Sequence, residues 1–70
     1  MNEEKLIALI DYWIEHNREH EQEFRDWADR AGSSSSEAAQ QLQEAAARMA
    51  EASECLEKSR QSLTRRGKEE

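Results

Sequence analysis

The sequence has no proline, only two glycines and a single cysteine. Proline and glycine are the residues that most often end or interrupt helices, so their scarcity favours long helices over nearly the whole chain. One cysteine excludes a disulfide within the chain, and a free thiol agrees with a reducing compartment.

Long apolar runs are absent too, and the N-terminus carries no positive region. No stretch reaches the roughly 20 residues needed to span a bilayer, and the segment Met1 to Glu4 lacks the basic start of a signal peptide. The net charge is -6, and the basic residues are scattered apart from the tail. This argues against a nucleic-acid surface and against binding to an acidic membrane. We therefore expect a cytoplasmic protein.

The chain length sets the second constraint. Its 70 residues suit one small domain, and a chain of this size buries only about 60% of its unfolded surface. Folds this small usually add disulfides, a metal or a partner chain. Since a disulfide is excluded, the sequence favours association or a metal. Ala, Glu, Gln, Lys, Arg and Leu dominate the composition, which predicts an all-α fold.

A first helix is predicted over about residues 3–31. Asn2 can cap its N-terminus, and Gly32 is the residue type that commonly closes a helix in the left-handed conformation. The residues of one face of this helix recur at alternating steps of four and three, the spacing of a helix face that packs on other helices. This stripe contains Leu6, Ile10, Trp13, Asn17, His20, Phe24, Trp27 and Ala31. We expect both tryptophans to be core anchors.

A serine-rich turn over residues 32–35 is predicted to join this helix to a second one over about residues 36–66. Ser34 and Glu37 have the spacing of a capping box, in which each side chain accepts a hydrogen bond from the other's backbone. Gly67 follows the predicted end of the helix. The apolar positions of the second helix recur every seven residues, at Leu42, Met49, Leu56 and Leu63.

The two helices differ in side-chain size, which predicts an antiparallel hairpin. The first carries all the aromatic residues, and the second has a broad face of small residues. Large side chains on one can fill the space above alanines on the other. If the chain reverses near residue 34, contacting positions have numbers that add up to about 68. His20 then lies near Met49, and Phe24 near Ala45.

A hairpin alone leaves part of this apolar surface uncovered. Ile7, Leu9 and Ile14 lie beside the main stripe of the first helix, and further alanines widen the face of the second. A homodimer forming a four-helix bundle would bury these residues. We therefore predict a homodimer, with association with a different protein partner as the alternative.

Polar residues interrupt the stripe at its middle and suggest a metal site. Asn17 and His20 occupy positions of the packing face, and His16 lies one turn before His20 on the same side. Two imidazoles four residues apart on a helix can bind one ion together, and Glu19 or Glu23 can complete or orient the site. Zn, Ni, Co and Fe all accept such ligands. This predicts a metal-handling protein for sequestration, delivery or sensing.

A metal-free interpretation stands beside it. Asn17 can set the register and oligomeric state, as a single buried polar residue does in coiled coils. His20 can hydrogen-bond Ser53 or its symmetry mate, while His16 faces water. The protein would then be a protein–protein interaction module, or a small acidic inhibitor of the antitoxin type. Cys55 is expected to be a half-exposed thiol outside the core.

A third interpretation takes residues 16–20 as H-x-x-E-H, the signature of inverted zinc peptidases. A catalytic zinc needs a third protein ligand, a water position and a substrate cleft. The chain has no further histidine, and a hairpin of this length offers little room for a cleft. We therefore predict that the protein is not an enzyme.

The segment from Leu9 to Ala28 resembles a family of short uncharacterised bacterial and archaeal helical-hairpin proteins. It contains W-I-E-H-N-x-x-H from Trp13 to His20, followed by F-x-x-W from Phe24 to Trp27 and then an alanine-rich helix. The resemblance covers most of the chain. It implies a helical hairpin and favours a shared site at His16, Asn17 and His20.

Overall fold

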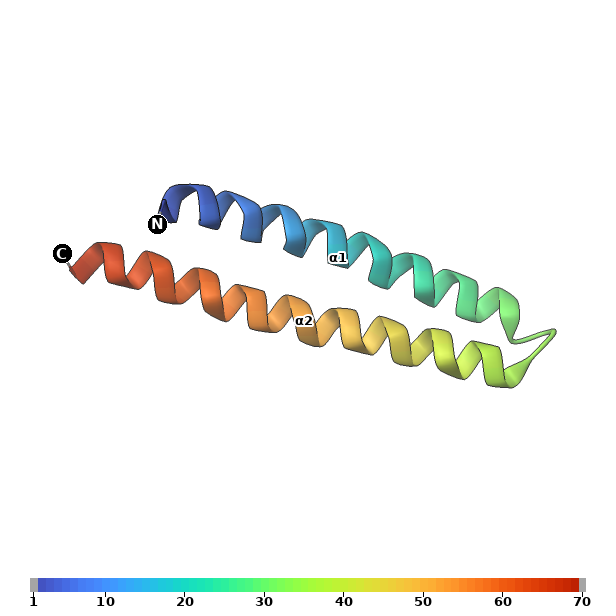
Figure 1. Ribbon diagram of the computed structural model, residues 1–70. Helices are drawn as coiled ribbons and strands as arrows, with labels where there is room; N and C mark the ends of the chain where they lie inside the picture. Colours follow the sequence, from blue (N-terminus) through green and yellow to red (C-terminus); the bar gives the residue numbers. More distant parts are fainter. Residues whose placement is uncertain (1, 70) are drawn as a thin grey trace.

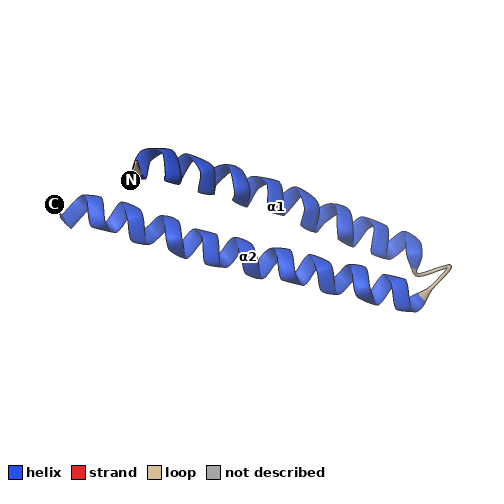
Figure 2. Ribbon diagram, in the orientation of Figure 1, coloured by secondary structure: helices blue, strands red, loops and turns tan. Residues whose placement is uncertain are grey.

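The computed structural model describes residues 2–69, with side chains described from Asn2 to Arg65, as two helices joined by a turn. Helix α1 spans Glu3–Ala31 and helix α2 spans Ser36–Glu69. The helices lie side by side and antiparallel, so both chain ends are at one end of a rod of 55 × 15 × 15 Å (Figure 1). Figure 2 shows helix and turn throughout this part of the chain. The predicted all-α hairpin is confirmed.

Helix α1 begins as predicted and ends differently. The side chain of Asn2 accepts a hydrogen bond from the backbone N–H of Lys5 at 3.1 Å, which caps the helix. Gly32, however, has φ -57° and ψ -28°, so the prediction of a left-handed residue is wrong. Its N–H donates to the carbonyl of Ala28 at 3.0 Å, and the N–H groups of Ser34 and Ser35 then bond the carbonyl of Ala31. The helix therefore tightens into a turn without needing a positive φ.

Helix α2 is capped by Ser35, whose Oγ accepts a hydrogen bond from the N–H of Ala38 at 3.1 Å. The predicted capping box at Ser34 and Glu37 is one residue out of place, because Ser34 is part of the preceding turn. At its other end α2 runs through Gly67 to Glu69, beyond the predicted end near residue 66. A single glycine weakens a helix by about 1 kcal/mol, and no proline follows to stop it. Glu70, part of the expected tail, lies outside the described residues.

The line of closest packing between the helices runs along one side of the predicted stripe. Its buried residues are Ile10, Ile14, Ala28, Ala46 and Ser53. The two tryptophans expected in the core are instead 40% exposed at Trp13 and 55% exposed at Trp27. The buried positions of both helices hold small or branched side chains, which pack closely together. The tryptophans therefore lie on the edge of the contact.

Charged residues bridge the helices at several levels. Arg25 donates to Gln43, and Arg60 donates to the Asp11 carboxylate, pairs whose numbers add up to 68 and 71, close to the predicted 68. The hydrogen bond to Asp11, and then its negative charge, raise the pKa of Arg60. These contacts align the helices, and because the pairs are largely exposed each adds little stability.

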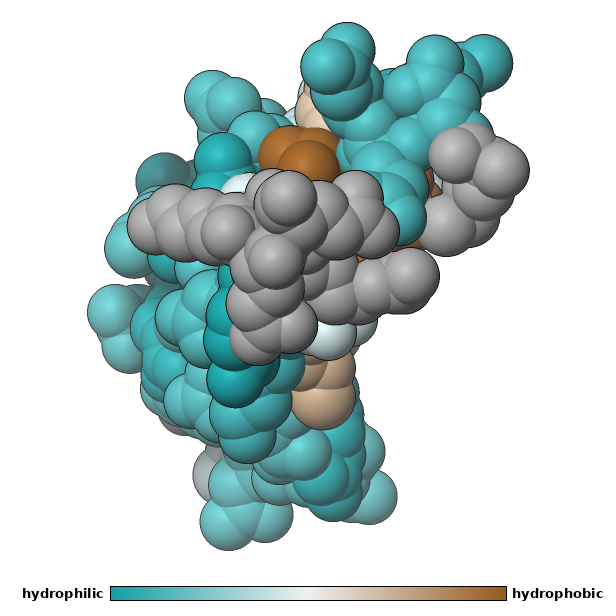
Figure 3. Space-filling model, turned by 90° about the vertical axis from the view of Figure 1, so that its left-hand side faces the viewer, coloured by the Kyte–Doolittle hydropathy of each residue, from teal (hydrophilic) through white to brown (hydrophobic). Residues whose placement is uncertain are grey.

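The molecular surface is mainly hydrophilic. Seen from the end that carries both chain termini, only small hydrophobic areas show between hydrophilic side chains (Figure 3). In the described part of the chain, neither helix combines the length and apolar character needed to cross a membrane.

Candidate functional site

His16 and His20 meet on the surface of α1 near the middle of the helix. Their Nε2 atoms are 3.0 Å apart, and the two rings lie edge to face with centroids 4.5 Å apart. Helical geometry produces this approach, because residues four apart are stacked on the same side. The side chain of His20 is 40% exposed and His16 is exposed. The pair is therefore open to an ion from solution.

Glu23 lies beside one of the two rings. Its Oε1 is 3.5 Å from Nδ1 of His20, and the two form an ion pair only when the ring is protonated. The tautomer of His20 with its proton on Nδ1 would leave its Nε2 to accept a hydrogen bond from Nε2 of His16. A carboxylate behind an imidazole is the arrangement that commonly holds metal-binding histidines in the correct tautomer.

The separation of the two nitrogens suits a single metal ion. Imidazole nitrogens bind zinc at about 2.0–2.1 Å, so two of them 3.0 Å apart enclose an angle of about 94° at the ion. This angle matches two neighbouring ligands in octahedral or square geometry and is smaller than the tetrahedral angle. For an ion to bind between them, the proton shared by the two Nε2 atoms would move to Nδ1 of His16, which leaves a free lone pair on each Nε2.

The other predicted ligand, Glu19, lies near His16. Both residues line a shallow hollow of about 170 Å³ together with Tyr12 and Glu15. Within the described residues, no three His, Cys, Asp or Glu side chains converge on one point. One chain thus offers two nitrogen donors, and the remaining ligands of an ion have to be water or a second molecule.

Two aromatic rings extend the histidine pair into a ladder. Tyr12 stacks on His16 with centroids 5.6 Å apart, and Phe24 stacks on His20 at 5.8 Å. The four rings follow one another at steps of four residues, so the ladder can be recognised in the sequence from this spacing. Stacking restricts the rotation of both imidazoles and so helps to hold the two Nε2 atoms together.

The remaining polar residues near the middle of the hairpin do not join the pair. Asn17 is half-buried. Ser53 is 6% exposed, and its Oγ has no hydrogen-bond partner among the described residues. The hydrogen bond from His20 to Ser53, expected in the metal-free interpretation, is therefore wrong. Cys55 is a free, exposed thiol outside the core, as predicted.

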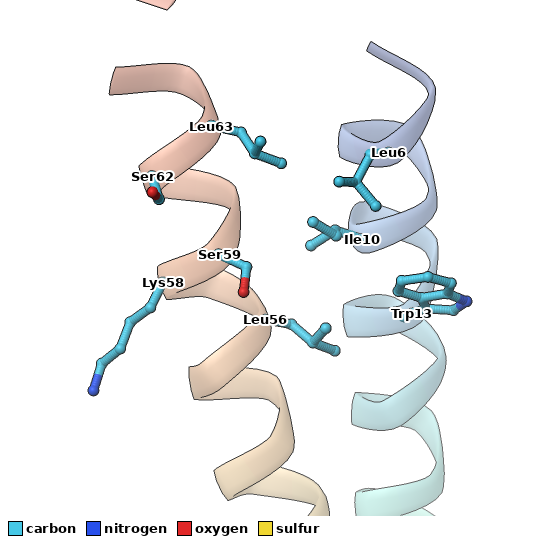
Figure 4. A pocket seen from close by; sticks show the side chains of 8 residues that line it. All are labelled: Leu6, Ile10, Trp13, Leu56, Lys58, Ser59, Ser62 and Leu63. Atoms are coloured by element: carbon cyan, nitrogen blue, oxygen red, sulfur yellow. The ribbon is translucent and has the colours of Figure 1, made fainter. Parts of the chain in front are cut away.

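An apolar hollow opens between the helices toward the end with the chain termini. Its volume is about 560 Å³. Figure 4 shows leucine and isoleucine side chains pointing into it from both helices, with the Trp13 ring at its edge. The main lining residues are Leu6, Ile10, Trp13, Leu56, Ser59 and Leu63.

Comparison with known proteins agrees with this description. A family described as a domain of unknown function (DUF8180) matches residues 6–63. The chain belongs to this family. An uncharacterised protein of the archaeon Archaeoglobus fulgidus is 40% identical over 55 residues, which cover 79% of this chain and 89% of the archaeal protein. No solved structure matches the chain. The family match includes the histidine pair, the aromatic ladder and the apolar hollow.

Proposed function

We propose that this DUF8180 hairpin binds a transition metal ion through His16 and His20. The observation that carries the proposal is the 3.0 Å separation of the two Nε2 atoms, which suits two neighbouring ligands of one ion. Glu23, which lies 3.5 Å from His20, and Glu19, which lines the same hollow as His16, are the proposed assisting carboxylates. Zn, Ni, Co and Fe are the candidate ions, since all accept imidazole and carboxylate ligands.

We further propose that the active form is a homodimer, a four-helix bundle of two hairpins. Only five of the side chains described from Asn2 to Arg65 are buried, which is a small core for an independent fold. A second chain adds both apolar surface and a second pair of imidazoles. Four imidazoles at one level of the bundle would complete the coordination that one chain leaves open.

The biological role that fits such a site is metal sequestration, delivery or sensing in the cytoplasm. Catalysis is not part of the proposal, because four histidine ligands leave little space for a substrate at the ion. The W-I-E-H-N-x-x-H segment, which contains both histidines, is proposed to be the shared signature of the family.

Metal titration tests the proposal. Protein made without a histidine tag is titrated with Zn, Ni and Co by calorimetry, and its mass is followed by light scattering. We expect one ion per two chains, a dissociation constant of about micromolar or lower, and twice the 8.2 kDa chain mass. The His16→Ala/His20→Ala variant should lose the ion and keep its helicity. A Gln40→Ala/Gln41→Ala variant, which changes two exposed residues of α2 outside the site and retains both imidazoles, is the matched control and should still bind.

A metal-free interaction module is the second candidate. The observation that favours it is the exposure of large apolar side chains, above all Trp27 at 55% and Tyr12 at 61%, which is typical of association surfaces. Wild-type protein that takes up none of the three ions at micromolar concentration, yet remains dimeric, would establish this candidate and remove the metal proposal. An acidic inhibitor would instead be monomeric until a basic partner is added.

A further inference from the structure

The apolar side of the hairpin carries a protruding ring and an apolar hollow, well separated along α1. Trp27 is 55% exposed, with Arg30 lying 4.7 Å above its ring. Trp13, at the edge of the hollow, is fourteen residues away. Fourteen residues make nearly four helical turns, so both tryptophans lie on the same side of α1. A flat aromatic ring and an apolar hollow on one face are complementary in shape and in chemistry.

The surface area of the chain is large enough for a second copy to cover part of it. A compact folded monomer of 8.2 kDa exposes about 4,500 Å², whereas the hairpin exposes 5409 Å². The excess of about 900 Å² is close to the roughly 800 Å² that each partner buries in a stable interface of standard size. A second copy of the same chain is therefore large enough to cover the excess.

We infer that Trp27 of a second copy fills the hollow between α1 and α2, and that the exchange is mutual. In a twofold dimer each residue pair occurs twice, so Trp27 of each chain enters the hollow of the other. The hollow is centred near the level of Ile10, which places the axis halfway between residues 10 and 27. The two hairpins are then antiparallel, with their serine turns at opposite ends.

This arrangement deepens the proposed function, on whose dimer it rests. The level halfway between Ile10 and Trp27 is that of residues 18 and 19, between His16 and His20. The twofold axis therefore passes the histidine pair, and the imidazoles of both chains face one another across it. A dimer with both turns at the same end would place each hollow opposite its own copy and leave both unfilled.

The distance between the two turns tests the orientation. A spin label is attached to the Ser34→Cys variant, with Cys55→Ser removing the native thiol, and dipolar distances are measured in EDTA. With 1.5 Å per residue, the two labels should be about 45 Å apart. A distance below about 25 Å would mean that the turns are at the same end, and would overturn the inference while leaving the dimer intact.

The occupant of the hollow is tested separately. In a Trp13→Phe variant, the emission of Trp27 alone should shift to shorter wavelength as the protein concentration rises and the ring leaves water. Trp27→Ala should weaken dimerisation at least about 100-fold, the loss expected for a buried tryptophan hot spot present twice. The exposed Gln40 of α2 lies outside the hollow, so Gln40→Ala is the control and should dimerise normally.

The outcomes distinguish this inference from the metal proposal because every measurement is made without metal. An unchanged dimer in Trp27→Ala, with helicity retained, would overturn the exchange even if the histidines bind an ion. A long turn-to-turn distance with no metal uptake would leave the arrangement standing and remove the metal function. A monomer at all concentrations in EDTA would overturn the arrangement, while metal titration would still decide whether the histidines bind.

Discussion

Replacing Ser53 by alanine should make the protein more stable. Ser53 is 6% exposed, and within residues 2–65 its Oγ has no hydrogen-bond partner. The hydroxyl of Ser59, by contrast, donates to the carbonyl of Cys55 at 3.1 Å. Burying an unpaired hydroxyl costs about 1–3 kcal/mol in proteins. Alanine also has a helix propensity better than serine by about 0.5 kcal/mol. It removes one buried atom, so the cavity term that opposes this gain is small.

The expected gain for Ser53→Ala is about 1–2 kcal/mol in the free energy of unfolding. It can be measured by urea denaturation followed by circular dichroism at fixed protein concentration, since dimerisation makes stability depend on concentration. Each kcal/mol corresponds to a rise of about 4–8 °C in Tm for a chain of this size. Ala46, one heptad earlier and also buried, provides the matched control. Ala46→Ser should lose a similar amount.

A loss of stability in Ser53→Ala would refute this reasoning. It would mean that the Ser53 hydroxyl has a partner in the assembled protein, such as a buried water or a group of the second chain. Ala46→Ser then shows whether a buried hydroxyl is unfavourable one heptad earlier. If both variants are less stable than the wild type, a hydroxyl is favourable at residue 53 and unfavourable at residue 46, so the partner is specific to Ser53.

Three smaller predictions follow. Gly32→Ala should stabilise the protein by about 0.4–1 kcal/mol. Gly32 already has a right-handed backbone conformation, and an added Cβ would only contact the carbonyls of Ala28 and Asp29 at 3.6 Å. A lower Tm of the variant would show that the turn needs another conformation. Asn2→Ala should cost about 1 kcal/mol through loss of the cap, and Asn2→Ser should not, as denaturant unfolding can test. Glu23→Gln should weaken metal binding about 10- to 100-fold in calorimetry, and equal affinity would exclude an orienting role.

Sequence reasoning located the helices well because the decisive signals are local. Asn2 has a free oxygen for the N–H of Lys5, and four consecutive serines weaken a helix wherever they occur. The difference in side-chain size between the two helices then predicted that they pack against each other as a hairpin. The histidine pair could be found for the same reason, since a spacing of four on a helix fixes the distance between side chains whatever the rest of the fold does.

The position of the packing contact could not be predicted in the same way. Ile10 belongs both to the predicted stripe and to the observed core. One turn later the predicted stripe continues through Trp13, whereas the observed core continues through Ile14. Choosing between them depends on how closely the second helix approaches. That distance is set by Ala28 and Ala46, which are far from Trp13 in sequence. Hydrophobicity alone predicts that Trp13 is buried, whereas close packing of the two helices favours burial of the smaller Ile14.

The presence of two neighbouring apolar stripes on α1 bears on how the protein assembles. A helix that touches one neighbour needs one apolar stripe, whereas a helix in a four-helix bundle touches two neighbours and needs two stripes side by side. Helix α1 has both: α2 covers the one through Ile10 and Ile14, and the one through Trp13 and Trp27 remains exposed. The second stripe is too regular to be surface chance, since its tryptophans lie seven residues on either side of His20. A partner that covers it has to pass the histidine pair, so association and metal binding are expected to be coupled. Dilution of the protein should then release the metal, and removal of the metal should weaken the dimer by the same factor.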